Sequence, residues 1–267
     1  MKRERDYVLG TNDVEIQRLG VQHRAWRDFA LQAWRRAGFG AGDRLIDVGC
    51  GPGYATRDLA KVVGPKGRVT AVDRSQRFLA YLREQRLPNV DVVETDLAKA
   101  ALPVRGADGA WARWVFAFVG QPRALLKAAA KALRPGGKLV LHEYFHYRTF
   151  RTVPHLSIVD TFVAAVEKSV RADGGNLDIA PHLLEWLDDS GFELEHAQPI
   201  ARVARPGEPA WDWVASFLDT APERQAGLGL FPKSGVAKVR QSVQAVKRAP
   251  DGLIIAPAVM EIIAVRR

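Results

Sequence analysis

The stretch LIDVGCGPGYATRDLA, which begins at Leu45, constrains the fold of this chain more than any other. A short apolar run leads into three glycines at alternate positions, Gly49, Gly51 and Gly53, and a helical pattern begins at Tyr54. Because glycine loses more backbone freedom on folding than other residues, three in one turn indicate main chain that something must approach closely. A turn between a strand and a helix also presents free backbone N–H groups at the positive end of the helix dipole. The stretch therefore predicts a ligand-binding loop at a strand–helix junction.

Strands and helices alternate through the sequence from Arg44 to Tyr147. The predicted strands are 44–50, 68–75, 90–96, 106–119 and 138–146, and the predicted helices are 54–63, 75–87 and 122–133. Alternation at this spacing is typical of βαβ units, which place their strands in a parallel sheet. The strands are almost continuously apolar, as expected for a sheet that is covered on both faces.

The segments on either side of this region are predicted to be mainly helical. Residues 1–43 have the pattern of a leader with two amphipathic helices. Beyond Tyr147 the pattern predicts helices at 158–170, 178–192, 211–221 and 235–246, and strands at 193–203 and 259–267. We find no repeat, low-complexity tract or linker, so we expect one domain, 1–267. Its parts are the leader 1–43, a ligand-binding core 44–147, and 148–267 with the remaining sheet and inserted helices.

Composition places few restrictions on function. The formal net charge of +9 suits a nucleic-acid or other anionic partner, but the basic residues are scattered, which favours a solvated surface. The single cysteine, Cys50, excludes an intrachain disulfide and a thiolate metal site. The N-terminal stretch MKRERDYVLG lacks the apolar region of a signal peptide, and no apolar run is long enough to span a bilayer. We therefore expect a cytoplasmic protein.

An acidic residue follows the glycine loop at the distance expected for nucleotide binding. Asp73 stands at the end of the second predicted strand, where a carboxylate can bond a ribose diol. Loop and acid together indicate an adenosine-containing cofactor, for which two classes compete. Dinucleotide folds prefer G-x-G-x-x-G, whereas this loop reads G-C-G-P-G-Y and has Tyr54 where a small residue is expected.

The motif DVGCGPG resembles the signature loop of class I S-adenosylmethionine-dependent methyltransferases. AVDRS, ETDLAKAALP and LRPGGKLVL resemble later motifs of that family, and the resemblance covers roughly residues 40–147. The opening YVLGTNDVEIQRLGVQHRAW is similar to leaders of bacterial small-molecule methyltransferases near the quinone-biosynthesis group. The resemblance implies a Rossmann-like α/β fold with a seven-stranded, mostly parallel sheet whose last strand is antiparallel. We expect 1–43, 147–190 and 205–250 to form helical lid segments over the carboxyl ends of the strands.

The same resemblance assigns contacts to the cofactor S-adenosylmethionine. The residues concerned are Asp47, Gly49, Gly51, Gly53, Asp73, Arg74, Asp96, Leu97 and Arg113. In the family, the positions of the glycines lie against the methionine part, Asp47 faces the ammonium group, and Asp73 binds the ribose. Asp96 matches the position that bonds the adenine amino group, and Arg113 borders the methionine part. Each acid also has a structural alternative, as a solvated acid at a strand end or a favourable charge at a helix N-terminus.

The end of the fifth predicted strand, HEYFHY, is the first place to look for a catalytic base. Period two puts His142, Tyr144 and His146 on one face and Glu143 on the other. A base is needed only if the methyl acceptor carries a proton, and a histidine suits that role near neutral pH. We predict His146 first, because it lies furthest along the strand, and Glu143 second. His23 in the leader is a further candidate, and each of these residues could instead belong to the core or the rim.

Aromatic residues outside the core segment favour a small, apolar or aromatic metabolite as the methyl acceptor. They are Trp26, Trp34, Phe162, Trp186, Trp211, Trp213 and Phe217, which could form a lid or merely pack the inserted helices. Base-methylating nucleic-acid enzymes often carry N-P-P-Y or D-P-P-Y after the fourth strand, where this chain reads RWVFAF, so nucleic acid is not favoured. Two alternatives stay open: an RNA or protein methyltransferase, which the net charge would suit, and a regulatory protein that binds the cofactor without transfer. No metal site is predicted, and the oligomeric state is left open.

Overall fold

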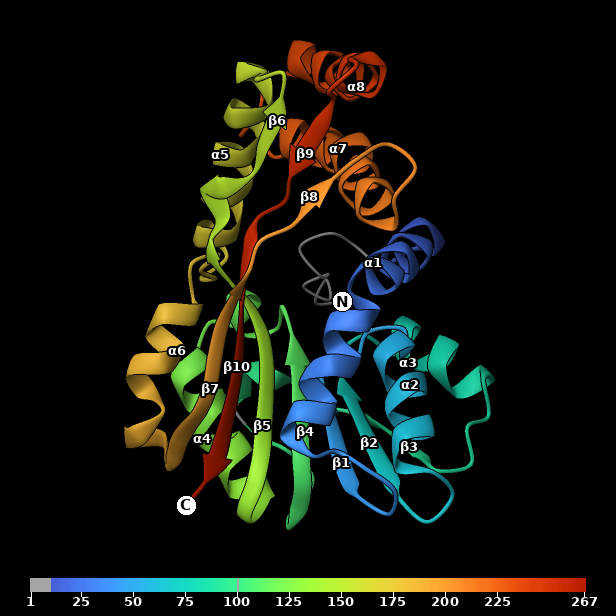
Figure 1. Cartoon of the computed structure of the whole chain (residues 1–267), viewed down its shortest axis with the longest axis vertical. Coiled ribbons are helices and arrows are strands. Elements are labelled where there is room, and N and C mark those ends of the chain that lie inside the picture. The colour runs from blue at the N-terminus through green and yellow to red at the C-terminus, as the bar shows by residue number, and fades with distance from the viewer. Residues whose placement is uncertain (1–10, 100) are drawn as a thin grey trace, which may run out of the picture.

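The computed structural model describes residues 11–99 and 101–267, so the first ten residues of the predicted leader lie outside the described residues. Its centre is a seven-stranded sheet (Figure 1). The strands are β1 Arg44–Val48, β2 Arg68–Asp73, β3 Val90–Glu94, β4 Ala107–Arg113, β5 Leu133–His146, β7 Phe192–Ile200 and β10 Ala258–Arg266. Their order is β3-β2-β1-β4-β5-β10-β7, in which β1 to β5 are parallel and β10 is antiparallel to both β5 and β7. The predicted sheet is confirmed.

Helices cover both faces of this sheet, as its apolar strands require. They are α1 Asp13–Ala37, α2 Tyr54–Val63, α3 Gln76–Glu84, α4 Pro122–Ala132 and α6 Ala180–Trp186. Trp34 of α1 and Trp111 of β4 meet edge to face in a cluster that joins α1 and α2 to the sheet. On the opposite face, α4 packs against α6 and β5 (Figure 1). Within the part of the chain that the structure describes, no helix is long and apolar enough to cross a lipid bilayer.

Within its described residues, 11–43, the leader forms one helix where two were predicted for 1–43. The side chain of Asn12 caps α1 by accepting a hydrogen bond from the backbone N–H of Glu15 at 2.9 Å, and Gly38 ends the helix with φ of 82°. Gly20 does not interrupt it. A Cβ at Gly20 would come within 2.9 Å of the ring of Tyr54, so the glycine allows α1 to pack closely on α2.

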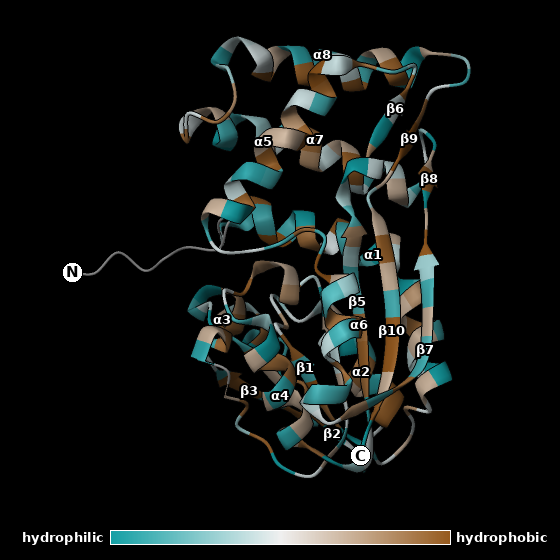
Figure 2. Ribbon diagram, turned by 90° about the vertical axis from the view of Figure 1, so that its left-hand side faces the viewer, coloured by the Kyte–Doolittle hydropathy of each residue, from teal (hydrophilic) through white to brown (hydrophobic). Residues whose placement is uncertain are grey.

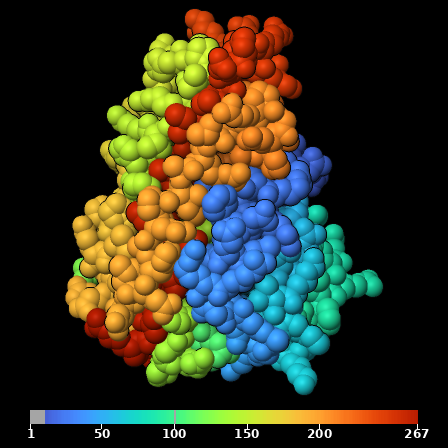
Figure 3. All heavy atoms as spheres, viewed as in Figure 1, coloured from blue at the N-terminus to red at the C-terminus, as the bar shows by residue number. Residues whose placement is uncertain are grey.

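A second layer, which we call the cap, stands over the carboxyl ends of the parallel strands (Figures 1 and 2). It consists of α5 Ser157–Ala172, α7 Pro209–Gly227, α8 Lys233–Arg248 and the short strands β6 Arg151–Val153, β8 Val203–Ala204 and β9 Leu253–Ile255. The short strands form an antiparallel sheet in the order β6-β9-β8. This sheet was not predicted, and it continues the last three strands of the large sheet, because β5 leads into β6, β7 into β8 and β9 into β10. In the space-filling view, α7 of the cap lies directly against α1 (Figure 3).

Two segments depart from the sequence prediction. The helix α6 belongs to the predicted lid segment 147–190, but it packs against α4 and β10 beside the sheet and not in the cap. The strand β4 ends at Arg113 and not at residue 119, because the main chain turns at Trp114, whose φ is 52°, into a short 3-10 helix, Phe116–Phe118. A positive φ is uncommon for a bulky residue, so this turn is held by its surroundings.

Candidate active site

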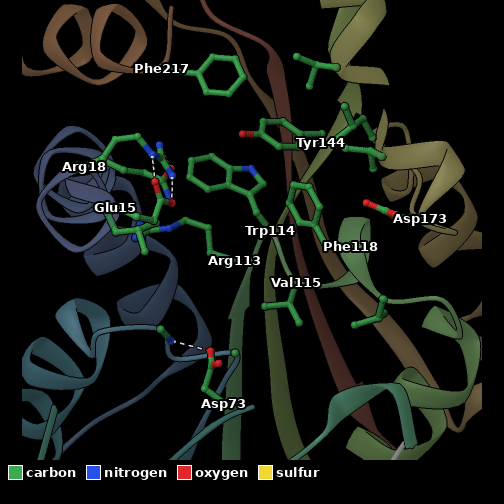
Figure 4. Close-up of a pocket in the computed structure, with 18 of the residues that line it drawn as sticks. Glu15, Arg18, Asp73, Arg113, Trp114, Val115, Phe118, Tyr144, Asp173 and Phe217 are labelled. Carbon is green, nitrogen blue, oxygen red and sulfur yellow. Dashed lines mark hydrogen bonds and ion pairs between the residues drawn. The ribbon is translucent and has the colours of Figure 1, made fainter. Parts of the chain in front are cut away.

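A cavity of about 880 Å³ lies between the sheet and the cap (Figure 4). One part, which we call the loop end, is lined by Asp47, residues 49–52 and 54, Asp73, Arg74, Asp96, Leu97 and Arg113. The other part, the cap end, is lined mainly by apolar and aromatic side chains, among them Trp114, Tyr144, Tyr147, Phe150, Trp213 and Phe217. Eight of the nine residues predicted to bind a cofactor therefore come together at the loop end, and Gly53 lies just outside it.

The glycine loop occupies the strand–helix junction between β1 and α2. Gly49, Gly51 and Gly53 have φ values of 69°, 54° and 83°, in the left-handed region that favours glycine. A Cβ at Gly49 would come within 2.5 Å of Val115, and one at Gly53 would overlap Leu82. Two glycines are thus required by packing within the protein, a reason that the sequence did not reveal. Gly51 is different, because its nearest neighbour would be 3.9 Å away, and it borders the cavity.

Asp73 ties the glycine loop to the start of α3. Its Oδ2 accepts a hydrogen bond from the backbone N–H of Gly51 and its Oδ1 from that of Ser75, both at 2.9 Å. Burial raises the pKa of this carboxyl, and the backbone hydrogen bonds oppose that rise. A carboxylate has about four acceptor sites, so each oxygen of Asp73 retains capacity for a ligand hydroxyl. The structural and the ligand-binding interpretations of this residue are therefore compatible.

Opposite charges flank the centre of the cavity. Asp47 on β1 is buried and accepts a hydrogen bond from Thr56 Oγ1 at 2.6 Å, and burial raises its pKa to about 6. Arg113 ends β4 and lies over the rings of Trp111 and Trp114, 5.9 and 5.4 Å from their centroids. Burial lowers the pKa of Arg113 to about 10, so the guanidinium remains positive at neutral pH. Its Nη1 is buried and has no hydrogen-bond partner among the described residues, which leaves a donor for a ligand.

His23 is held between Arg113 and an acid of α2. Its Nδ1 lies 3.2 Å from Arg113 Nη2 and its Nε2 lies 3.0 Å from Asp58 Oδ2. Since a guanidinium only donates, Nδ1 accepts and the proton resides on Nε2, which donates to Asp58. Arg27 bonds the same carboxylate at 2.6 Å. With burial lowering its pKa and both nitrogens occupied, His23 is a neutral link that orients Arg113 and has no free lone pair for a base.

Asp96, Leu97 and Arg74 line the far side of the loop end. Asp96 Oδ1 accepts a hydrogen bond from the backbone N–H of Ala98 at 3.1 Å, in the turn that follows β3. Leu97 is buried beside it and presents an apolar surface to the cavity. A carboxylate and an apolar surface thus lie side by side on this wall of the cavity.

The two residues predicted as bases on β5 do not line the cavity. The pairing of β5 with β10 shifts between Tyr144 and His146, so a β-bulge at Phe145 breaks the period-two alternation. His146 is exposed as a result. Glu143 is fully buried, and its carboxylate accepts hydrogen bonds from the backbone N–H groups of Val115 at 2.7 Å, Phe116 at 2.9 Å and Ala117 at 3.3 Å. Although burial raises its pKa to about 7, its contacts mark it as the residue that holds the turn after β4.

Aromatic rings make up one wall of the cap end. Trp114 stacks on Tyr144 with centroids 5.0 Å apart and on Trp213 with centroids 5.4 Å apart. Tyr147 meets Tyr144 edge to face at 5.1 Å. Figure 4 shows Phe217 facing this stack across the cavity. The aromatic lid predicted from the tryptophans is therefore present in part, since Trp213 and Phe217 line the cavity whereas Trp26 and Trp34 are core residues.

Residues 46–141, which carry the glycine loop and the strands around it, match the family described as a methyltransferase domain. This segment is a class I methyltransferase domain. The strand order and the antiparallel β10 agree with that assignment, and the resemblance seen in the sequence is confirmed. The cap and the leader lie outside the matched residues of the methyltransferase domain.

Curated relatives extend the likeness beyond the methyltransferase domain. An uncharacterized 37.1 kDa protein in transposon Tn4556 of Streptomyces fradiae is 32% identical over 193 residues, which are 72% of this chain and 54% of that protein. The ubiquinone/menaquinone biosynthesis C-methyltransferase UbiE of Pseudomonas fluorescens is 29% identical over 130 residues, which are 47% of this chain and 50% of that enzyme. The chain thus spans about half the length of the curated relatives it matches.

Solved structures share the fold of the methyltransferase domain together with most of the cap. The geranyl diphosphate C-methyltransferase of Streptomyces coelicolor has a TM-score of 0.59 at 17% identity, covering 92% of this chain and 77% of that one. The [4+2]-cyclase SpnF has a TM-score of 0.57 at 21% identity, covering 90% and 80%. At these identities the likeness concerns the fold alone, and it includes proteins named for different chemistry.

The sequence alone did not single out several polar residues of the cavity wall. Glu15, Arg18 and Gln22 lie on the inner side of α1 and line the cavity (Figure 4 labels the first two). Their spacing of three and four residues was a usable signal, because it places polar side chains on one stripe of a helix. That stripe also carries Trp26, so it faces the protein interior.

Proposed function

We propose that this protein transfers a methyl group from S-adenosylmethionine to a small, apolar or aromatic molecule. The proposal rests on one observation: a buried carboxylate, Asp47, and a buried guanidinium, Arg113, both line the loop end of a cavity whose other end is aromatic. S-adenosylmethionine carries an ammonium and a carboxylate on one carbon, so a buried carboxylate and a buried guanidinium with an unused donor match it in charge. The printed functions of UbiE and of the geranyl diphosphate enzyme, both C-methyltransferases, support the same reaction class.

The residues of the loop end fit this cofactor in order. In the proposed arrangement, Asp73 would receive the ribose hydroxyls, while Asp96 and Leu97 would receive the adenine ring, with Arg74 beside it. Gly51 would allow the main chain to lie against the methionine part, since only Leu19 lies near the position that a Cβ would take there. The buried acids also suit a ligand with a positively charged sulfur.

The chain contributes chiefly by positioning. When bound, the cofactor would supply a methyl group on a sulfonium; an acceptor atom in line would bond to the methyl carbon as its bond to sulfur breaks, and S-adenosylhomocysteine would leave. Holding the acceptor in line with that methyl group accounts for much of the acceleration of such a reaction. The aromatic stack of Tyr144, Trp114 and Trp213 would orient a flat acceptor, and the cap would exclude water. The two nitrogens of His23 are already engaged, so it offers no base for a proton on the acceptor.

A second candidate function is cofactor binding without methyl transfer. We retain this candidate function because a protein named as a [4+2]-cyclase has a similar fold. In both cases the loop end would bind the cofactor, and only the chemistry at the cap end would differ.

The proposal is tested by incubating the protein with S-adenosylmethionine labelled in its methyl group and an extract of the source cells. We expect label in small molecules that partition into an organic solvent. Label in precipitated RNA or protein would support a macromolecular substrate instead. No transfer, together with measurable binding of S-adenosylhomocysteine, would support the second candidate function.

Cofactor binding should depend on pH through Asp47. A ligand ammonium favours the ionised carboxylate, so binding lowers the raised pKa of Asp47 and releases a proton, and affinity must fall as pH drops below about 6. Because only about a tenth of such carboxyls are ionised at pH 5, calorimetry with S-adenosylhomocysteine should give roughly tenfold weaker binding there than at pH 7.5. The side chain of Asp47→Asn can still accept the hydrogen bond from Thr56. Its loss of affinity between pH 7.5 and pH 5 should be smaller than that of the wild type, although some loss remains because burial also raises the pKa of Asp73. An equal pH dependence in both proteins would contradict the assignment of Asp47.

A further inference from the structure

The cap end contains an ion pair that the proposed cofactor contacts do not use. Arg18 and Glu15 lie one turn apart on α1, and both are buried, with 6% and 5% of their surfaces exposed. Arg18 Nε bonds Glu15 Oε2 and Arg18 Nη2 bonds Glu15 Oε1, both at 2.7 Å. Figure 4 shows the pair on the side of the cavity opposite Tyr144, with Trp114 between them. Removing two charges from water is costly, so an ion pair buried in the wall of a cavity calls for an explanation beyond packing.

The surroundings of the pair place it near the aromatic stack. Arg18 Nη1 also donates to Gln22 Oε1 at 3.2 Å, and the same oxygen accepts from Trp213 Nε1 at 3.1 Å. The pair is thereby connected to the cap helix α7. The positive charge of Arg18 also opposes the rise in pKa that burial produces at Tyr144 and Tyr147. Arg18 and both tyrosines line the same cavity, so one ligand can reach all three.

The pair has hydrogen-bonding capacity left over. A guanidinium carries five N–H groups, and the contacts to Glu15 and Gln22 use three of them. Among residues 11–99 and 101–267, one N–H on Nη1 and one on Nη2 are therefore left for a ligand. Each carboxylate oxygen of Glu15 accepts one bond from Arg18 and can accept another. The pair thus offers a donor and an acceptor side by side, and its net charge is zero.

This combination selects a particular chemical group. A hydroxyl both donates and accepts, so it can use the free N–H of Arg18 and the free lone pair of Glu15 together. A carboxylate or phosphate would bring a second anion next to Glu15, and an ammonium would bring a second cation next to Arg18. A hydrocarbon group could bond neither the free N–H of Arg18 nor the free lone pair of Glu15. Arg224 also lines the cavity, but it already has a partner within the protein.

We propose that the Glu15–Arg18 pair binds a hydroxyl group of an uncharged substrate whose remaining body is apolar. The proposal rests on the proposed function, because it takes the cap end as the place of the methyl acceptor. It adds what the function alone does not specify: the charge of the substrate and the polar group that fixes its orientation. The pair is a specificity determinant in this proposal, and the accepting atom is not assigned to it.

The test uses three probes of one shape: 1-naphthol, 1-methylnaphthalene and 1-naphthoate. Equilibrium dialysis with the full chain, with and without saturating S-adenosylhomocysteine, measures the dissociation constant of each. We expect 1-naphthoate to bind weakest. The ratio of the constants of 1-methylnaphthalene and 1-naphthol is then compared between the wild type and Glu15→Leu/Arg18→Met. Both charges are removed together, because a single substitution would leave the other charge buried without a partner.

We expect the double substitution to lower the preference for 1-naphthol roughly tenfold, as charge-assisted hydrogen bonds imply. The exposed pair Glu223–Arg240, 3.1 Å apart between α7 and α8, lies outside the cavity, so Glu223→Gln/Arg240→Met should leave the ratio unchanged. An unchanged ratio in the cavity variant, no binding of 1-naphthol to the wild type, or tighter binding of 1-naphthoate would overturn the proposal. The dissociation constants of the three probes with the wild type test the proposal even if the variant does not fold. Failure of the proposed function would appear separately, as absent binding of S-adenosylhomocysteine.

Discussion

Replacing Asp73 by alanine is expected to weaken the binding of S-adenosylhomocysteine by roughly 10- to 150-fold. The estimate follows from about 1.5–3 kcal/mol for hydrogen bonds to a charged group, which the ribose would lose. The backbone N–H groups of Gly51 and Ser75 also lose their acceptor, so the loop itself is expected to become less ordered. Isothermal calorimetry on the purified variant measures the effect.

A matched control is available on the neighbouring strand. Glu94 is paired with Asp73 in the register of β2 and β3, but it is exposed and does not line the cavity. Glu94→Ala should therefore bind S-adenosylhomocysteine like the wild type. If Asp73→Ala remains folded by thermal unfolding and binds with unchanged affinity, Asp73 does not hold the ribose.

Replacing Glu143 by leucine is expected to lower the free energy of unfolding by about 3 kcal/mol or more. Three backbone N–H groups, those of Val115, Phe116 and Ala117, would lose their acceptor in a buried turn, at about 1–3 kcal/mol for each unsatisfied donor. For a domain of this size we expect a decrease in Tm of roughly 6–12 °C, measured by calorimetry or circular dichroism. Glu143→Gln keeps one acceptor oxygen, so its loss should be smaller.

The same variants separate a structural role from a catalytic one. The exposed Glu193 on β7 provides a control, and Glu193→Gln should leave Tm unchanged. A Glu143→Gln protein with normal Tm and greatly reduced methyl transfer would contradict the structural role and restore the original hypothesis of a base on β5.

The loop end could be predicted from the sequence, because the glycine loop and Asp73 follow strand ends and the resemblance to class I methyltransferases added Asp47, Asp96 and Arg113. Asp47, Asp73, Asp96 and Arg113 each stand where a parallel strand finishes, and parallel strands finish at the same edge of a sheet. Their convergence on one cavity follows from that topology, without any knowledge of side-chain contacts.

The cap end could not be predicted in the same way, because its features depend on tertiary contacts. The bulge at Phe145 turns His146 out of the cavity, and nothing in HEYFHY reveals it. The backbone of the 3-10 turn at Phe116–Phe118 donates a hydrogen bond to Glu143, which lies 27 residues further along the chain. The position of α6 beside α4 depends on which apolar surface it meets, and its own pattern is that of any amphipathic helix. The strands β6 and β8 are too short to produce a periodic signal.

Three of the four crossings between sheet and cap have a mechanical consequence. At 147–150, 201–202 and 256–257 the chain joins a strand of the large sheet to a strand of the small one, whereas the fourth crossing, at 173–179, connects α5 to α6. These three connections lie side by side, because the strands that they join have the same order in both sheets. A rotation of the cap against the sheet would have to bend all three connections at once, which disfavours a large movement. Solutes would then exchange by movements of individual side chains and helix ends at the rim, with sheet and cap staying in fixed register. Such a cavity would admit a flat, narrow molecule more readily than a bulky one.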